Sequence, residues 1–258
     1  MYSPRMPLRI ISLVPSQTEL LFDLGLEKRI AGITRFCIHP DPATHSLMKV
    51  GGTKKIHHDT IRQLNPDLII ANKEENSRED IESLIQDYPV WISNVQGFES
   101  ALDMIHSIGL ITSTSTKADQ LIAEISREFE ALEEFVMQSD LRSKKLKTAY
   151  LIWEKPLMVV GKDNFVHSMI ETCGLINAFE DQSRYPVTSI EEVRARNCDL
   201  FILPSEPFPF TEKHVEQYER LLEGVKIVRA NGEMFSWYGS RMKLAHSYFI
   251  SLLRQISS

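Results

Sequence analysis

The residues best suited to chemistry are aromatic rings beside polar groups, which suit ligand binding. Phe235, Trp237 and Tyr238 stand close together just before the last predicted helix, and Arg241 lies in its first turn. Aromatic rings form walls for large flat molecules, and a guanidinium donates forked hydrogen bonds to carboxylate, phosphate or amide oxygens. This cluster therefore predicts a binding surface for an amphipathic ligand.

Further candidates lie where predicted strands end or where the chain turns, because rings and free backbone N–H groups at such places can face a ligand. These five residues are Pro15, Ser16, Phe36, Gly52 and Trp153. Ordinary structural roles remain open for some of them. Trp153 and Phe235 are equally suited to a core, Ser16 to capping a helix, and Arg241 to capping at the surface.

Metal binding and catalysis are the competing kinds of chemistry. Cys37 and His39, with His45, His57 and His58 nearby, supply thiol and imidazole groups that metals accept. Their spacing matches no tight metal motif, and the sequence contains no nucleophile elbow, phosphate-binding loop or dinucleotide glycine motif. We therefore expect no metal site, no intrinsic cofactor and no enzymatic activity.

The composition is that of a globular protein with a sizeable core. Of the 258 residues, 43% are apolar and 25% are charged, and the net charge is -6. A negative chain does not favour nucleic acid or an anionic membrane as a partner. Three well-separated cysteines do not form a disulfide framework.

Apolar runs and helical periodicity alternate along the chain. The first half predicts strands at 9–14, 30–34, 67–71 and 90–93, and helices from Ser16 and over 77–87 and 98–108. The second half predicts strands at 148–153, 200–203 and 227–230, and helices over 164–173, 189–196, 212–222 and 238–256. This alternation indicates parallel sheets with helices on their faces. Ser16 followed by Glu19 has the spacing of a helix capping box.

One long helix is predicted between the two halves. Apolar residues recur at spacings of three and four from Leu121 to Val136, so we expect a helix over about 116–141. The expected domains are an N-terminal α/β lobe at 1–113, a linking backbone helix at 114–145 and a C-terminal α/β lobe at 146–258. Each lobe would be Rossmann-like, with the ligand cleft between the lobes, since domain interfaces often hold binding sites.

Four stretches, taken in order with the long helix among them, form a specific pattern. They are RIISLVPSQTELLFDL at 9–24, GGT and IRQLNPDLII within 51–70, LPSEPFPF at 203–210, and FSWYGSR at 235–241. This pattern resembles the helical-backbone substrate-binding proteins of ABC importers, which carry cobalamin, ferric siderophores or haem. The resemblance covers nearly the whole chain and is closest to the cobalamin-binding branch.

The resemblance implies a protein that binds cobalamin or an iron chelate and delivers it to a permease. It places Phe36 and Arg241 in the ligand cleft. Lys54 and Lys55 depart from the pattern, because cobalamin binders can place an aromatic residue there. This departure favours an acidic chelate.

The resemblance also implies how the protein docks to a permease: one acidic residue on each lobe meets arginines of the permease. The resemblance makes Glu206 the candidate of the second lobe, and Glu75 and Glu79, beside Glu74, the candidates of the first. An ordinary solvated charged face is the alternative at these positions.

The resemblance also implies a periplasmic protein, which we expect to be a monomer. The chain as given begins with MYSPRMP and continues directly into an apolar strand, with no signal core. A cytoplasmic location is therefore the alternative. Two other functions stay open with it: a carrier or sensor for a corrinoid or tetrapyrrole, and a chelatase-like enzyme.

Overall fold

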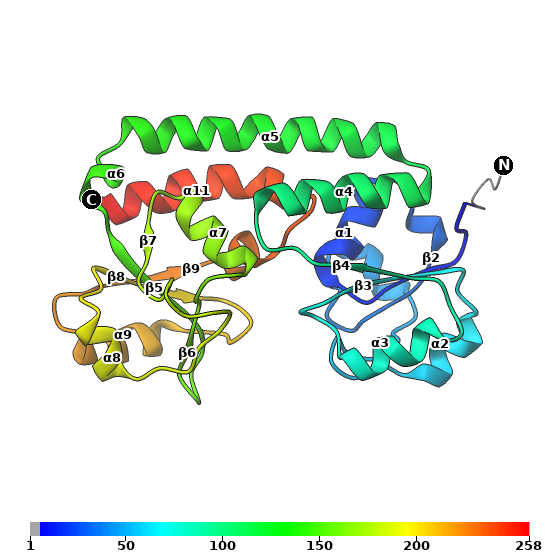
Figure 1. The fold of residues 1–258 in the computed structure, drawn as a ribbon, viewed down its shortest axis with the longest axis horizontal. Helices are drawn as coiled ribbons and strands as arrows, with labels where there is room; N and C mark the ends of the chain where they lie inside the picture. Colours follow the sequence, from blue (N-terminus) through cyan, green and yellow to red (C-terminus); the bar gives the residue numbers. More distant parts are fainter. Residues whose placement is uncertain (1–5, 258) are drawn as a thin grey trace. The chain divides into compact units, whose positions relative to one another are not determined.

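The computed structural model describes residues 6–257, which form two compact units (Figure 1). Unit 1 comprises the described residues up to Val95, with Glu99–Ile125 and Trp237–Arg241. Unit 2 comprises Gln96–Phe98, Ser126–Ser236 and the described residues from Met242 onward. Each unit has its own mainly parallel sheet and its own helices, which confirms the predicted α/β class with two lobes.

Unit 1 contains a four-stranded parallel sheet with the strand order β2-β1-β3-β4. Its strands are β1 (Ile10–Ser12), β2 (Ile30–Ile33), β3 (Leu68–Asn72) and β4 (Val90–Ser93). Its helices are α1 (Pro15–Asp23), α2 (His58–Leu64), α3 (Arg78–Ile85) and α4 (Phe98–Thr112), with short 3-10 turns η1 (Glu27–Arg29) and η2 (Ala43–Ser46).

Both faces of the unit 1 sheet are covered by helices. Strands β1 and β3 are buried along their whole length, as expected for parallel strands between two helical layers. One face packs on α2 and α3 through a cluster that contains Ile11, Leu13, Ile61, Ile69, Ala71, Ile81 and Leu84. Figure 1 shows α1 and α4 on the opposite side of the same sheet.

Unit 2 contains a five-stranded sheet with the path β6-β5-β8-β9, and β7 also pairs with β5. Its strands are β5 (Lys147–Trp153), β6 (Met158–Val159), β7 (Ile176–Asn177), β8 (Leu200–Pro204) and β9 (Lys226–Ala230). Its helices are α6 (Leu141–Lys144), α7 (Phe165–Thr172), α8 (Ile190–Ala195), α9 (Glu212–Leu221), α10 (Gly232–Ser236) and α11 (Met242–Ser257). Among the described strands of unit 2, β6 alone pairs antiparallel, and the sequence did not predict β6 or β7.

The core of unit 2 lies on both faces of β5 and β8. Ala149 and Leu151 point to the face that packs on α8 and α9, together with Phe201 and Leu203. Tyr150 points the other way, where its ring lies 5.1 Å from the ring of Phe235, which lies 4.7 Å from that of Phe249 in α11.

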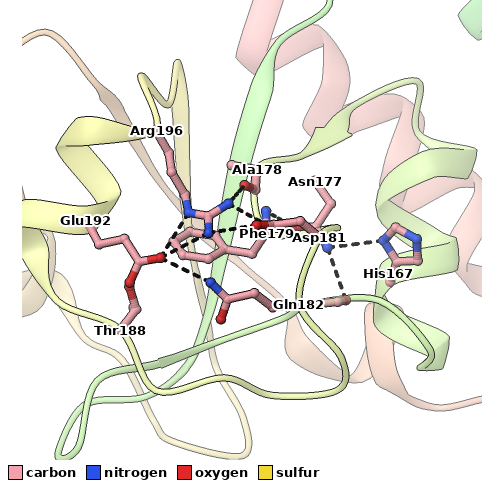
Figure 2. Close-up of polar contacts among 10 residues, drawn as sticks. His167, Asn177, Ala178, Phe179, Asp181, Gln182, Thr188, Glu192 and Arg196 are labelled. Carbon is pink, nitrogen blue, oxygen red and sulfur yellow. Dashed lines mark hydrogen bonds and ion pairs between the residues drawn. The ribbon is translucent and has the colours of Figure 1, made fainter.

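A polar network in unit 2 joins α8 to the segment 177–188 (Figure 2). The Arg196 guanidinium lies 4.2 Å from the Phe179 ring centre and donates to an Asp181 carboxylate oxygen at 2.7 Å. Glu192 accepts a second bond from Arg196 at 3.0 Å and one from the Thr188 hydroxyl at 2.9 Å. The network therefore fixes a long irregular segment against a short helix.

Helix α5 (Ser115–Gln138) is one continuous helix of 24 residues. Its buried positions include Leu121, Ile125, Phe129 and Leu132, at the spacing read from the sequence. Its residues up to Ile125 group with unit 1 and those from Ser126 group with unit 2. Helix α5 ends at Gln138, about three residues before the predicted end near Leu141. Leu141 itself begins a separate short helix, α6.

Two sequence predictions at helix ends were wrong. The last helix begins at Met242 rather than Tyr238, because Gly239 has a φ of +106°, which interrupts helical geometry. Helix α1 begins at Pro15 with Val14 as its N-cap and with no side-chain cap, so Ser16 and Glu19 form no capping box there. Among residues 6–257, no helix combines the length and apolar character needed to cross a membrane.

Candidate functional site

The carboxyl edge of the unit 1 sheet gathers several of the predicted site residues. Because the four strands run parallel, the segments that follow them leave the sheet at the same edge. Pro15 and Ser16 follow β1, and Phe36 follows β2. Open α/β sheets bind ligands beyond the carboxyl ends of their strands.

Two asparagines that the sequence analysis missed hold this edge together. The Asn76 amide donates to the backbone oxygens of Leu13 and Thr53, both at 3.1 Å, and so joins the segment after β1 to the glycine turn. Asn72, at the end of β3, donates to the Ser93 hydroxyl at 3.0 Å. Their signal in the sequence is the pair of asparagines flanking the acidic run directly after a buried strand.

Pro15 and Ser16 form the first turn of α1. Ser16 is buried, and Pro15 is half-buried. The next residue, Gln17, is fully buried and donates to the Ser93 hydroxyl, whereas its side-chain oxygen has no hydrogen-bond partner among the described residues. The first turn of α1 therefore brings buried polar side chains to the carboxyl edge of the sheet. Packing, and not a side-chain cap, fixes the position of this turn.

Phe36 is the most exposed ring at this edge, with 48% of its surface accessible. The structure brings it beside Gly52: a Cβ atom on Gly52 would lie 3.2 Å from the Phe36 ring. The guanidinium of Arg35 lies over the ring of Phe36, 4.9 Å from its centre. Phe36, Arg35 and Gly52 thus form one surface, which is apolar at the ring and cationic beside it.

Trp237, Tyr238 and Arg241 group with unit 1, although they follow α10 of unit 2. Arg241 is 8% exposed and binds the Glu19 carboxylate through two bonds, Nε–Oε2 at 2.8 Å and Nη2–Oε1 at 2.6 Å. Its guanidinium also lies 4.9 Å from the Trp237 ring, which His39 contacts edge-on at 5.3 Å. Glu19 thus neutralises the charge that the sequence analysis assigned to a ligand.

The aromatic cluster read from the sequence does not stay together. Phe235 groups with unit 2 and is fully buried between Tyr150 and Phe249. Trp153 ends β5 at the carboxyl edge of the unit 2 sheet and is 41% exposed. It contacts Phe208 edge-on at 5.5 Å, and its indole N–H donates to the Lys155 carbonyl at 3.1 Å.

The three acidic candidates for docking lie in different settings. Glu79 is exposed in the first turn of α3. Glu75 is half-buried, and its backbone N–H donates to the Asn72 side chain at 3.1 Å. Glu206 is half-buried in unit 2 and accepts a hydrogen bond from the Ser236 hydroxyl at 2.7 Å.

The thiol and imidazole groups near the edge do not assemble into a metal centre. Burial raises the pKa of the Cys37 thiol, which packs against the Thr18 and Thr34 hydroxyls, so Cys37 stays protonated near neutral pH. Within residues 6–257, no three His, Cys, Asp or Glu side chains come close enough to hold a metal ion.

Each of the two α/β units has a mainly parallel sheet with an exposed ring at its carboxyl edge, and this is the edge at which open α/β sheets bind ligands. The sequence family described as "Periplasmic binding protein" matches residues 10–224. The vitamin B12-binding protein of Vibrio campbellii (strain ATCC BAA-1116) is 30% identical over 194 residues, which are 74% of this chain and 69% of that protein. The chain therefore belongs to the periplasmic binding protein family.

Solved structures share the fold across nearly the full chain. The periplasmic vitamin B12 binding protein BtuF of Vibrio cholerae has a TM-score of 0.81 at 19% identity, covering 98% of both chains. The periplasmic heme-binding protein RhuT from Roseiflexus sp. RS-1 has a TM-score of 0.80 at 18% identity, covering 97% of this chain and 99% of that one. At such identities, these likenesses show the fold alone.

Proposed function

We propose that this protein binds cobalamin or an iron chelate, such as haem or a ferric siderophore, and delivers it to the permease of an ABC importer. Membership of the family supports a binding role without catalysis. The names of the relatives, which bind vitamin B12 or haem, support this class of ligand.

The observation that carries the proposal is the exposed ring of Phe36 beside a bare glycine and a guanidinium. A flat ligand stacked on this ring would remove apolar surface from water, which contributes about 1–3 kcal/mol. Gly52 lets such a ligand approach the backbone, because a side chain there would meet the ring. Neighbouring contacts in unit 1 would come from Pro15 and Ser16.

The other predicted residues take different parts in this proposal. Trp153 is a candidate for ligand contact on unit 2 by itself, since its ring is exposed. Trp237 and Tyr238 are buried, so they would support the surface of unit 1 instead of contacting the ligand. Arg241 would do the same, because it is paired with Glu19. Phe235 is left out of the proposed site because its ring is fully buried.

A fluorescence titration tests the proposal. The chain has three tryptophans, and corrinoids and iron chelates absorb in the near ultraviolet, where tryptophan emits, so binding should quench the emission. Cyanocobalamin, haem and a set of ferric siderophores would be titrated separately into protein shown to be folded by circular dichroism. We expect saturable quenching by at least one of them. Quenching by none would reject the proposed class of ligand.

Delivery would take place in the periplasm, with the protein acting as a monomer. We propose that one acidic residue of each unit meets arginines of the permease: Glu79 or Glu75 in unit 1 and Glu206 in unit 2. Among these, Glu79 is the most accessible, and it lies in the first turn of a helix, where packing does not hold it.

A further inference from the structure

The exposed ring of Phe36 lies in a tight turn directly after β2. The turn runs from Thr34 to Cys37, and the Cys37 backbone N–H donates to the Thr34 carbonyl at 3.2 Å. Phe36 is the third of the four residues, so the two ends of the turn determine where its ring lies. The support of these ends matters, because a side chain that becomes ordered only when a ligand arrives weakens binding.

Both ends of the turn are buried in a cluster of hydroxyl and thiol groups. Thr34 and Cys37 are 0% and 1% exposed, and the Thr34 hydroxyl lies 3.2 Å from the Cys37 sulfur. Thr18 of α1 donates to the same sulfur at 3.1 Å and to the Ser12 hydroxyl of β1 at 2.8 Å. This hydroxyl–thiol cluster of Ser12, Thr18, Thr34 and Cys37 therefore joins the turn to both β1 and α1.

The hydroxyl–thiol cluster is closed to water. Ser12 and Thr18 are fully buried as well, and their hydroxyls donate to the Val14 carbonyl at 3.2 and 2.9 Å. Burial raises the pKa of the Cys37 thiol, so the sulfur enters the cluster as a neutral group. Hydrogen bonds are stronger in such surroundings than in water, and loss of one member leaves its buried partners unsatisfied. The position of the turn therefore depends on each member.

The turn also contacts the glycine turn that follows Val50. The backbone N–H of Arg35 donates to the Gly51 carbonyl at 2.8 Å. The Phe36 ring lies so close to Gly52 that a Cβ atom there would be 3.2 Å from it. The α protons of Gly52 can therefore report where the ring lies.

We infer that the hydroxyl–thiol cluster positions the Phe36 ring, so that Thr18, Thr34 and Cys37 are positioning residues that affect ligand affinity without touching the ligand. The inference rests on the proposed function for the identity of the ligand. The cluster holds the turn in its binding form before the ligand arrives, which lowers the cost of ordering the ring. Changes in the cluster should therefore weaken binding only through Phe36.

Nuclear magnetic resonance of the ligand-free protein tests the positioning directly. An aromatic ring shifts the signals of nearby protons, so Phe36→Ala should move the α-proton signals of Gly52. Thr18→Val and Cys37→Ala should each move these signals toward their positions in Phe36→Ala. Thr18→Ser, which keeps the hydroxyl, and Thr148→Val, which removes a buried hydroxyl in unit 2, should leave them unchanged. Parent-like Gly52 signals in both Thr18→Val and Cys37→Ala would overturn the inference.

A double-mutant cycle then measures the effect on binding. With the best ligand of the fluorescence titration, Thr18→Val should raise the dissociation constant about threefold or more in the parent and leave it unchanged in Phe36→Ala. Equal effects in the two backgrounds would overturn the inference and leave the proposed function intact. If no ligand binds, the proposed function fails, and the Gly52 signals alone decide whether the cluster positions the ring.

Discussion

At the scale of single residues, the ion pair of Glu19 and Arg241 decides how the C-terminal segment is held in unit 1. The two side chains are 15% and 8% exposed, so both charges have lost most of their water. Loss of one partner leaves the other charge buried without compensation, which costs more than the intact pair contributes. The chief role of the pair is therefore to hold the segment Trp237–Arg241 against α1.

Glu19→Gln should lower the free energy of unfolding by about 2–4 kcal/mol, because the Arg241 charge stays buried without its counterion. The second substitution in Glu19→Gln/Arg241→Met should recover part of this loss. Urea unfolding followed by circular dichroism measures both. As a control, Arg62→Met removes a pair whose side chains are 68% and 87% exposed and should cost less than about 1 kcal/mol. Equal losses of unfolding free energy in Glu19→Gln and Arg62→Met would show that the buried pair does not hold the segment Trp237–Arg241 in place.

At the scale of elements, the network around Arg196 holds the segment 177–188 against α8 (Figure 2). The hydrogen bond from Arg196 lowers the pKa of the Asp181 carboxyl, and that from Thr188, followed by those from Arg196 and Gln182, lowers the pKa of Glu192. A carboxyl whose pKa is lower in the folded than in the unfolded state stabilises the fold above its unfolded pKa. That contribution is lost as the pH falls through the folded value.

Acidification from pH 6 to pH 3 should therefore destabilise the parent protein more than it destabilises Arg196→Met. Carboxyl pKa values near 4 are ordinary in unfolded chains, so most of the difference should develop below about pH 4. Thermal unfolding across this pH range measures it. Parallel curves for the parent and the variant would mean that Arg196 does not set these pKa values.

Elements were predictable where one local signal decided them. The apolar run that became β3 and the periodic apolar positions of α5 were both read correctly, because burial on a sheet or along a helix leaves a period in the sequence. The start of α11 was misplaced, since Gly239 at positive φ overrode the helical pattern around Tyr238.

The site was less predictable, because its contacts join distant parts of the chain. Phe36 and Gly52 were found as separate signals, and only the fold places one against the other. The partner of Arg241 lies 222 residues away, so no local pattern could assign its charge to Glu19. Likewise, Phe235 and Trp237 stand two residues apart and pack in different units.

At the scale of the whole molecule, membership of the family predicts two separate surfaces, one for the ligand and one for the permease. A binding protein must hold its ligand and also meet a permease, and the two tasks need separate surfaces. Phe36 lies at the carboxyl edge of the unit 1 sheet, whereas Glu79 lies in the first turn of α3, on a different segment. The two tasks should therefore respond to different substitutions.

Glu79→Gln should weaken association with the permease while the affinity for the ligand stays unchanged, because an exposed carboxylate acts through long-range attraction. Association with permease reconstituted in nanodiscs, measured at low and at high salt, tests this. Salt should weaken the parent more than the variant. Arg78→Gln, at the neighbouring exposed position, is the control for general effects on α3. Identical association of the parent and Glu79→Gln at both salt concentrations would remove Glu79 from the docking surface.

The claim that most of this account depends on is that the exposed ring of Phe36 binds the ligand. Its most direct test is the dissociation constant of the best ligand for Phe36→Ala, measured beside Ile85→Ala, which removes a side chain of similar exposure (47%) from α3. We expect a loss of about tenfold or more for Phe36→Ala, no change for Ile85→Ala, and little change in folding stability for either. An unchanged affinity in folded Phe36→Ala would contradict it.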